Sequence, residues 1–361
     1  MRVAYYSPLP PSRSGIADYS ALLLPALRER VDVSVAHEGL DPDADVALYH
    51  VGNDPQEHGW IVDALERRPG VVVLHEFVLH HLVSGVTLAR GDVDGYLRAM
   101  EREAGLVGRL LAQSVADGKV APLWETRPHD FPLAAEVLGH ATAVVVHSRF
   151  VADAVRETGY AQPVHVIPMP AWPAVEAAPD PLEGDPLIGC FGHQNESKRI
   201  PQLYAAFARL RETRPDARLV VVGSASRGVE NLVLPEGAAR ESYVPEERLW
   251  SLMTRADVHV SLRWPTMGET SAAVIRSLSL GRPLVVSSVG WFSELPEEVA
   301  LKVAPGEREI DALAEALERL CDQALRARMA AAALELARTE HGLSRVADRY
   351  AGVLAGSPVP A

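Results

Sequence analysis

Three turns of the sequence each join a β-rich run to a helical pattern and carry small and polar residues at the junction. They are residues 7–18 (SPLPPSRSGIAD), 189–199 (GCFGHQNESKR) and 263–271 (RWPTMGETS). The first N–H groups of a helix have no intrahelical partner, so a glycine at such a turn lets a phosphate or a sugar approach the backbone. The first turn has a single glycine, Gly15, for which a flexible turn without a ligand is the alternative.

The second turn ends in two basic residues, Lys198 and Arg199, directly before a strong helical pattern. Positive charge at the beginning of a helix opposes the helix dipole, and a bound anion would offset that unfavourable placement. A diphosphate fits this description, whereas the alternative is two solvated side chains. The turn therefore predicts a diphosphate site.

The third turn carries a carboxylate among small residues. Gly268, Thr270 and Ser271 allow backbone amides to line a concavity, and Glu269 can accept hydrogen bonds from sugar hydroxyls. Glu269 has an alternative interpretation as a carboxylate that only complements the dipole of the following helix. Together the three turns indicate a sugar linked to a diphosphate.

A histidine-rich segment, His75 to His81 (HEFVLHH), raises the question of a metal site. Its spacing is not the HExxH pattern that places two imidazoles on one helical face. We therefore expect no metal and no other cofactor. One interpretation of His75 is a hydrogen-bonded histidine that closes a strand.

The elements that must position these turns alternate along the chain as short β-rich runs and longer helical patterns, which is typical of parallel sheets covered by helices. A helix with a side made by Met100, Val107, Leu111 and Ser114 is expected at 94–117, and a second at 200–211. Strands are expected near 2–7, 31–36, 45–51, 70–75, 143–147 and 163–168, then at 187–191, 218–222, 257–262 and 283–287.

Six prolines between Pro168 and Pro186 prevent a continuous helix or strand there and indicate a linker. The prediction is α/β: a Rossmann-like domain at 1–170, a linker at 171–186, a second Rossmann-like domain at 187–340, and a helix with a tail at 341–361. Such sheets bind ligands at the carboxyl ends of their strands.

Composition limits the function further. The net charge of −13 argues against an enzyme that grips nucleic acid along a long surface. Cys190 and Cys321 lie in separate apolar runs, as buried thiols in a reducing compartment do, and no apolar run is long enough to span a membrane. We expect a cytoplasmic protein, with peripheral membrane association as an alternative.

Several segments taken together resemble the family 4 glycosyltransferases, retaining enzymes of the GT-B fold, over nearly the whole chain. Residues 191–199 resemble the family's glycine, arginine, four residues, lysine segment, and residues 268–283 resemble its acidic donor-site motif. Residues 288–294 resemble the glycine and glutamate segment that follows. Gly52-Asn53 with His58, and then residues 71–76, resemble a bacterial subgroup with a donor-side histidine.

The resemblance implies a GT-B fold with two domains facing each other across a cleft and a C-terminal helix that returns to the first domain. It implies transfer, with retention, of a sugar from a nucleotide-diphosphate sugar to an acceptor hydroxyl, with Lys198, Glu269 and His75 as catalytic residues. We predict donor contacts from Gly15, His193, Lys198, Arg199, Val244, Glu269, Thr270, Ser271 and Arg276, and acceptor-side contacts from Asp18, Asn53 and Glu76.

Two positions depart from the family pattern. His193 stands where the family often has an arginine, and Arg276 stands where a second glutamate usually holds the ribose. Ribose binding is therefore unassigned, and Arg276 either meets a phosphate or forms a salt bridge on its helix. A GT-B epimerase or phosphorylase, and a non-catalytic nucleotide-sugar-binding homologue, are the alternative functions. The expected partners are a nucleotide sugar and a small-molecule, glycan or lipid-linked acceptor, and not nucleic acid.

Overall fold

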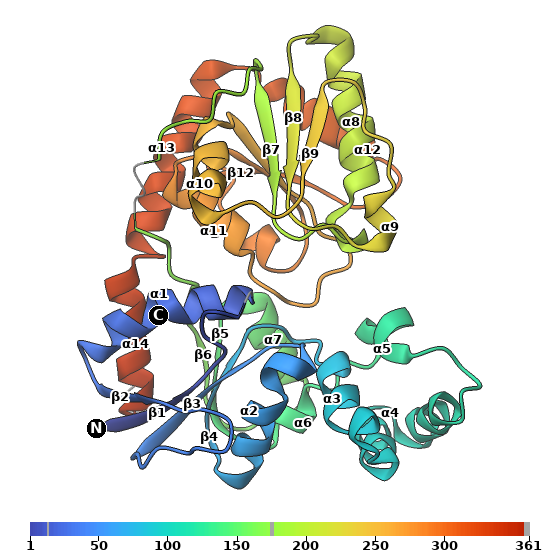
Figure 1. Ribbon diagram of the computed structural model, residues 1–361, viewed down its shortest axis with the longest axis vertical. Coiled ribbons are helices and arrows are strands. Elements are labelled where there is room, and N and C mark those ends of the chain that lie inside the picture. Colours follow the sequence, from blue (N-terminus) through green and yellow to red (C-terminus); the bar gives the residue numbers. More distant parts are fainter. Residues whose placement is uncertain (13, 174–176, 357–361) are drawn as a thin grey trace. The chain divides into compact units, whose positions relative to one another are not determined.

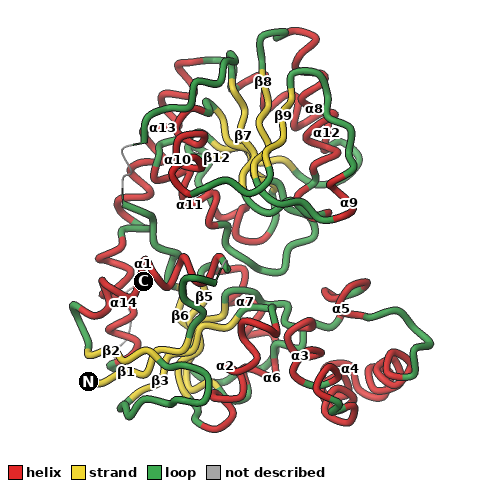
Figure 2. The backbone as a smooth tube through the Cα atoms, in the orientation of Figure 1, coloured by secondary structure: helices red, strands yellow, loops and turns green. Residues whose placement is uncertain are grey.

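The computed structural model describes residues 1–12, 14–173 and 177–356, which form two compact α/β units. Unit 1 contains residues 1–169, 267–270 and the chain from Ser344 onward, whereas unit 2 contains residues 170–266 and 271–343. Each unit has a parallel sheet with helices beside it (Figures 1 and 2). The α/β fold predicted from the sequence is thus confirmed.

The sheet of unit 1 has the strand order β2-β1-β3-β4-β5-β6, and every neighbouring pair is parallel. Its strands are rich in valine and other apolar residues because both faces of such a sheet are covered. They are β1 Arg2–Tyr6, β2 Asp32–Val35, β3 Val46–Val51, β4 Gly70–Leu74, β5 Ala141–Val146 and β6 Val164–Val166. All six correspond to predicted strands.

Neighbouring parallel strands need a crossover connection, and most of these connections in unit 1 are supplied by helices. They are α1 Gly15–Arg28, α2 Pro55–Arg67, α3 His80–Val86, α4 Val93–Ala116, α5 Leu123–Thr126, α6 Ala135–Leu138 and α7 Arg149–Glu157, with 3₁₀ turns at Leu88–Arg90 and Pro128–Asp130. Oxygen atoms of Ser14, Asp54 and Ser148 cap α1, α2 and α7 by accepting a hydrogen bond from the first turn.

Helix α4 corrects one sequence prediction. Non-helical dihedrals at Ala104 and Gly105, where Gly105 has φ 60° and ψ −151°, break the helix into two arms. Met100 before the break is buried, but Val107 after it is 66% exposed. The prediction that both lie on one side of a single helix is wrong, because the break rotates the second arm.

The C-terminal helix α14, Leu343–Leu354, belongs to unit 1 from Ser344 onward. Its buried side packs on α1, where the Tyr350 hydroxyl lies 2.7 Å from that of Tyr19. Arg30 at the end of α1 donates hydrogen bonds to Asp348 at 2.6 Å and to the Ser344 hydroxyl at 2.7 Å. The predicted return of the terminal helix to the first domain is confirmed. The last predicted residues, 357–361, lie outside the described part.

The sheet of unit 2 has the order β12-β11-β10-β7-β8-β9 and is also parallel. Its strands are β7 Leu187–Phe191, β8 Arg218–Val222, β9 Ala238–Glu241, β10 Val258–Ser261, β11 Leu284–Ser287 and β12 Ala300–Val303. The two edge strands, β9 and β12, are absent from the sequence prediction. Their sequences, AARE and ALKV, include charged residues that interrupt the apolar pattern.

The helices of unit 2 are α8 Ile200–Thr213, α9 Arg227–Glu230, α10 Glu246–Arg255, α11 Ala272–Ser279, α12 Glu309–Arg319 and α13 Gln323–Thr339, with 3₁₀ turns at Glu196–Lys198 and Gly290–Glu294. Helix α8 confirms the helical pattern predicted at 200–211. Its apolar side, with Leu203, Phe207 and Leu210, is buried in the core of the unit.

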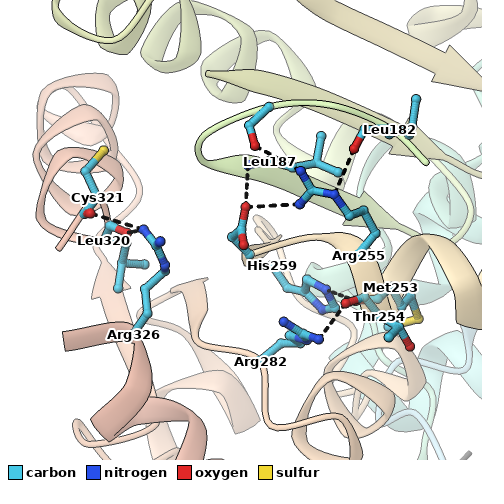
Figure 3. Close-up of polar contacts among 12 residues, drawn as sticks. Leu182, Leu187, Met253, Thr254, Arg255, His259, Arg282, Leu320, Cys321 and Arg326 are labelled. Atoms are coloured by element: carbon cyan, nitrogen blue, oxygen red, sulfur yellow. Dashed lines mark hydrogen bonds and ion pairs between the residues drawn. The ribbon is translucent and has the colours of Figure 1, made fainter. Parts of the chain in front are cut away.

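The proline-rich segment predicted as a linker has no helix or strand among its described residues; residues 174–176 of it lie outside the described part. Its end is fixed to α10, because Arg255 donates to the carbonyls of Leu182 at 2.8 Å and Gly184 at 3.0 Å. In the same region the buried His259 contacts the Met253 carbonyl and Arg282 contacts the Thr254 carbonyl (Figure 3). These polar contacts give the backbone carbonyls of α10 partners inside unit 2.

Candidate functional site

The carboxyl ends of the strands in unit 1 carry five of the predicted residues. Gly15 begins α1 after β1, and a Cβ there would meet no atom within 4 Å, so the backbone at this turn is open to a ligand. Asp18 lies exposed in the first turn of α1, and the half-buried His75 and Glu76 follow β4. Asn53 accepts a hydrogen bond from the Leu82 amide at 3.1 Å, which ties it to α3.

His75 lies in a cluster of aromatic rings. Its Nε2 is 3.0 Å from Nδ1 of His50, on the neighbouring strand β3. The Tyr19 ring of α1 meets the His75 ring edge-on at 4.9 Å, and the His147 ring lies 5.0 Å away. Burial lowers the pKa of His75 and of His50 well below the usual value, and the positive charge that neighbouring imidazoles would carry lowers both further. Both rings are neutral at physiological pH.

The loop Met267–Thr270 is part of unit 1, although the sequence prediction placed it in the second domain. The amides of Phe77 and Val78, just after His75, donate to the Met267 carbonyl at 2.8 and 3.1 Å. Gly268 has φ +88°, and a Cβ there would lie 3.0 Å from the Cβ of Phe77, so only glycine fits without displacement. The loop is thus docked against the end of β4.

Glu269 follows this glycine, and its Oε2 accepts a hydrogen bond from the Met267 amide at 2.8 Å. A carboxylate held by its own loop keeps a fixed orientation. Its charge also acts on His129, where burial lowers the imidazole pKa and Glu269 opposes that shift. The hydrogen bonds from the Phe77 and Val78 amides to the Met267 carbonyl form a loop clamp at the end of β4. Glu269 and Thr270 lie two and three residues after Met267, so the loop clamp positions both within unit 1.

In unit 2 the turn after β7 carries the predicted diphosphate residues. Gly192 has φ +98°, and a Cβ built on it would lie 3.8 Å from the Lys198 Nζ, so the ammonium lies close to this backbone. The buried Gln194 stabilises the turn, because its backbone N–H donates a hydrogen bond to the Ser224 carbonyl at 2.7 Å. Lys198, at the end of the following 3₁₀ turn, is only 7% exposed.

Arg199 has a carboxylate partner within unit 2. Its guanidinium forms an ion pair with Glu309 at 2.5 Å, and the Glu309 side chain is 1% exposed. From the sequence we expect a bound anion to offset the unfavourable placement of Arg199 at the beginning of a helix. In the structure the Glu309 carboxylate does this instead. Lys198 and Arg199 therefore lie in different environments.

Sequence reasoning missed one cation of this region, Arg263, at the end of β10. Arg263 is 9% exposed, and its Nη1 donates to the Ser197 hydroxyl at 2.8 Å, next to Lys198 in the chain. The Trp264 amide also donates to the Ser197 carbonyl at 2.7 Å. Burial raises the pKa of the Cys190 thiol on β7, whereas the positive charges of Lys198 and Arg263 lower it.

The sequence contains a signal that could have identified Arg263 as a site residue. It is the first residue after the apolar run that ends at Leu262, at the edge where parallel α/β sheets bind ligands. A charged residue that follows such a run directly is the signal that could have identified it.

The other predicted donor residues of unit 2 have structural contacts of their own. His193 is exposed, with its Nδ1 2.8 Å from the Ser224 hydroxyl, and Val244 packs against a small core cluster before α10. The Ser271 hydroxyl caps α11 by accepting from the Val274 amide at 3.4 Å. Arg276 is 8% exposed and stacks on the Trp172 ring, 4.1 Å from its centroid.

The Arg276 guanidinium thus lies on an aromatic ring of unit 2. Arginine on an aromatic face is a stabilising contact in its own right. The predicted residues are divided between the units as follows: Gly15, Asp18, Asn53, His75, Glu76, Glu269 and Thr270 in unit 1, and His193, Lys198, Arg199, Val244, Ser271 and Arg276 in unit 2.

Possible metal ligands and apolar helices are the next features of the described residues. Among residues 1–12, 14–173 and 177–356, no group of three or more His, Cys, Asp or Glu side chains is arranged to hold a metal ion. No helix in this part of the chain is both long and apolar enough to cross a bilayer.

Part of the chain is similar to a known protein family. Residues 185–323 match the model of the family described as "Glycosyl transferases group 1". This segment runs from the end of the proline-rich linker through β7 to the beginning of α13, and it includes Lys198, Arg263 and Glu269. No curated protein sequence matches the chain.

Solved structures resemble the chain over its full length. A sucrose-phosphate synthase (tll1590) from Thermosynechococcus elongatus has a TM-score of 0.65 at 20% identity, covering 99% of this chain and 100% of that one. Alr3699/HepE from Anabaena, in complex with UDP, has a TM-score of 0.64 at 15% identity with the same coverage. WaaG, a glycosyltransferase involved in lipopolysaccharide biosynthesis, has a TM-score of 0.59 at 15% identity, again covering 99% and 100%. The two parallel sheets thus form a GT-B fold.

Proposed function

We propose that this protein is a retaining, metal-independent glycosyltransferase of family 4 type that moves a sugar from a nucleotide-diphosphate donor to an acceptor hydroxyl. The observation that carries the proposal is the pair of buried cations, Lys198 and Arg263, beside the Gly192 turn. They come from two different strand ends: Arg263 donates to the Ser197 hydroxyl, and Lys198 is the next residue along the chain.

The chemistry of sugar transfer explains what such a pair does. As the glycosidic bond breaks, negative charge develops on the leaving nucleoside diphosphate. Cations that are already fixed and shielded from water stabilise this charge without reorganising. Lys198 and Arg263 are both less than a tenth exposed, and the Gly192 backbone leaves room for phosphate oxygens beside them. The pair therefore makes the diphosphate a better leaving group.

Glu269 and His75 have roles on the sugar. The Glu269 carboxylate, held by the Met267 amide, can accept hydrogen bonds from sugar hydroxyls, and a neutral His75 can contribute one hydrogen bond. In a retaining transfer without a protein nucleophile, the acceptor hydroxyl attacks from the face that the diphosphate leaves, and a phosphate oxygen takes its proton. The protein supplies orientation and charge stabilisation.

The same cations support the proposal of metal independence. Where Mg²⁺ or Mn²⁺ assists a nucleotide, it neutralises diphosphate charge. In this proposal Lys198 and Arg263 do so instead. We propose no resident cofactor, and the nucleotide sugar is the co-substrate.

Two measurements test the proposal. Thermal unfolding in the presence of UDP-, GDP-, ADP- and dTDP-sugars should reveal one that stabilises the protein, since a ligand that binds only the folded state raises its melting temperature. The UDP complex of the structural neighbour HepE makes UDP-sugars the first to try. Product analysis should then show no change in the nucleotide sugar without an acceptor. Epimerisation in the absence of an acceptor, or no stabilisation by any nucleotide sugar, would overturn the proposal.

A further inference from the structure

The pair formed by His50 and His75 contains one hydrogen bond whose direction the structure constrains. His50 is on β3 and fully buried, His75 follows the neighbouring strand β4, and the His75 amide donates to the Val51 carbonyl at 2.9 Å. This register brings Nδ1 of His50 to 3.0 Å from Nε2 of His75. One of these two nitrogens must carry the proton and the other must accept it.

Both rings are neutral, so each carries one proton on one of its two nitrogens. The neighbours that enclose the pair are aromatic: the rings of Tyr5 and Tyr19 lie 4.7 and 5.6 Å from the His50 ring, and the His147 ring lies 5.0 Å from the His75 ring. His58 donates from Nδ1 to the His50 carbonyl and leaves the His50 ring untouched. The surroundings therefore favour uncharged imidazoles.

The second nitrogen of His50 decides the direction. Within the described residues, the buried Nε2 of His50 has no hydrogen-bond partner. If His75 donated to His50, the His50 proton would have to sit on this Nε2, as a buried N–H without an acceptor. If His50 donates from Nδ1, Nε2 is left only with a lone pair. An orphaned buried N–H is the rarer and costlier of the two.

We infer that His50 donates its Nδ1 proton to His75 and thereby fixes His75 in the Nδ1–H tautomer, so that His75 offers a neutral N–H donor to a hydroxyl oxygen of the donor sugar. His50 is then a positioning residue. His75 as a residue is partly exposed, and in the described part of the chain no protein group forms a hydrogen bond with its Nδ1. The identity of the ligand rests on the proposed function, whereas the tautomer does not.

The direct test is the ¹⁵N spectrum of the free full-length protein labelled at histidine, in which a protonated ring nitrogen and one with a lone pair have well-separated shifts. The His75 signals are identified by their loss in His75→Gln. We expect Nδ1 of His75 to be protonated and Nε2 to be the acceptor. A protonated Nε2 in the wild-type protein overturns the inference, whether or not any nucleotide sugar binds.

Two variants of similar shape separate positioning from packing. In His50→Asn the side-chain amide can still donate to His75, so the tautomer should persist. In His50→Asp the carboxylate can only accept and should move the His75 proton to Nε2. His80→Asn serves as the control, because His80 is also buried but contacts the Tyr96 hydroxyl.

Activity gives the second readout once a donor sugar is known. We expect His50→Asp to lower kcat/KM by about tenfold or more, the worth of one ligand hydrogen bond, and His50→Asn to stay close to wild type. If His50→Asp folds, shows the inverted tautomer and retains full kcat/KM, His75 does not donate to the substrate. If the wild-type tautomer is as inferred but no nucleotide sugar binds, the proposed function fails and the tautomer assignment stands.

Discussion

Replacing Lys198 by alanine tests the charge stabilisation most directly. Two unit charges about 4 Å apart interact by about 4 kcal/mol at an effective dielectric constant of about 20. The bridging oxygen gains only part of a charge as the bond breaks, so we expect a loss of about 2–4 kcal/mol, or about 30- to 1,000-fold in kcat/KM. Arg263→Ala should have an effect of the same size, since the two side chains are equally buried.

The assay is initial-rate kinetics with the nucleotide sugar found in the thermal screen. Arg209→Ala is the matched control: it removes a cation of unit 2 whose side chain is 51% exposed and paired with Asp311 at the surface. If both cations act on one diphosphate, the double variant should lose less than the product of the two single effects. Activity of Lys198→Ala within about threefold of wild type, a loss of less than 1 kcal/mol, would refute the reasoning.

Four further predictions concern stability and conditions. Gly268→Ala should destabilise the loop clamp and reduce transfer, because φ is +88° and the new Cβ would lie 3.0 Å from Phe77; an unchanged melting temperature would contradict this. Tyr19→Phe and Tyr350→Phe should each cost about 1–3 kcal/mol by leaving a buried hydroxyl unpaired, and urea unfolding of the double variant should show less than the sum. Because burial lowers the pKa of His58 to about 4, the unfolded chain binds its proton first, so the melting temperature should be steady above about pH 6.5 and fall toward pH 4; a rise on acidification would contradict the assignment. EDTA should leave transfer unchanged, and inhibition that Mn²⁺ reverses would overturn the metal-free proposal.

The fold was predictable where a local pattern decides the structure. The apolar runs of β1, β3 and β7 and the helical spacing in α8 are set by burial on known faces, and the sequence shows both periods directly. The edge strands β9 and β12 were not predicted, because an edge strand pairs on one side only and can carry charged residues such as Arg240 and Lys302.

The break in α4 could not be predicted from the sequence for a different reason. A glycine inside a helical pattern costs about 1 kcal/mol relative to alanine but does not by itself end a helix, and nothing in the periodicity shows that Gly105 adopts a positive φ. The exposed Val107 follows from that single backbone choice.

The candidate site was predictable in its residue types and less so in its connections. The glycine turns, Lys198 and Glu269 were visible from the spacing of motifs. The partner of Arg199 was not, because Glu309 lies 110 positions further along the chain. The same holds for Arg263 beside Ser197 and for the loop clamp between Phe77 and Met267, since no local signal reports which distant segments pair.

The packing of α14 on α1 has a consequence for biosynthesis. Tyr19 and Tyr350 are 331 positions apart, so the first unit to leave the ribosome has to wait for almost the entire chain before its core is complete. Until then the apolar side of α1 has no cover from α14, and contacts between such distant segments form slowly. Nascent chains stalled before Ser344 should therefore hold an unfinished first unit, and a nonsense mutation that removes only the last helix should send the protein to chaperones and proteases.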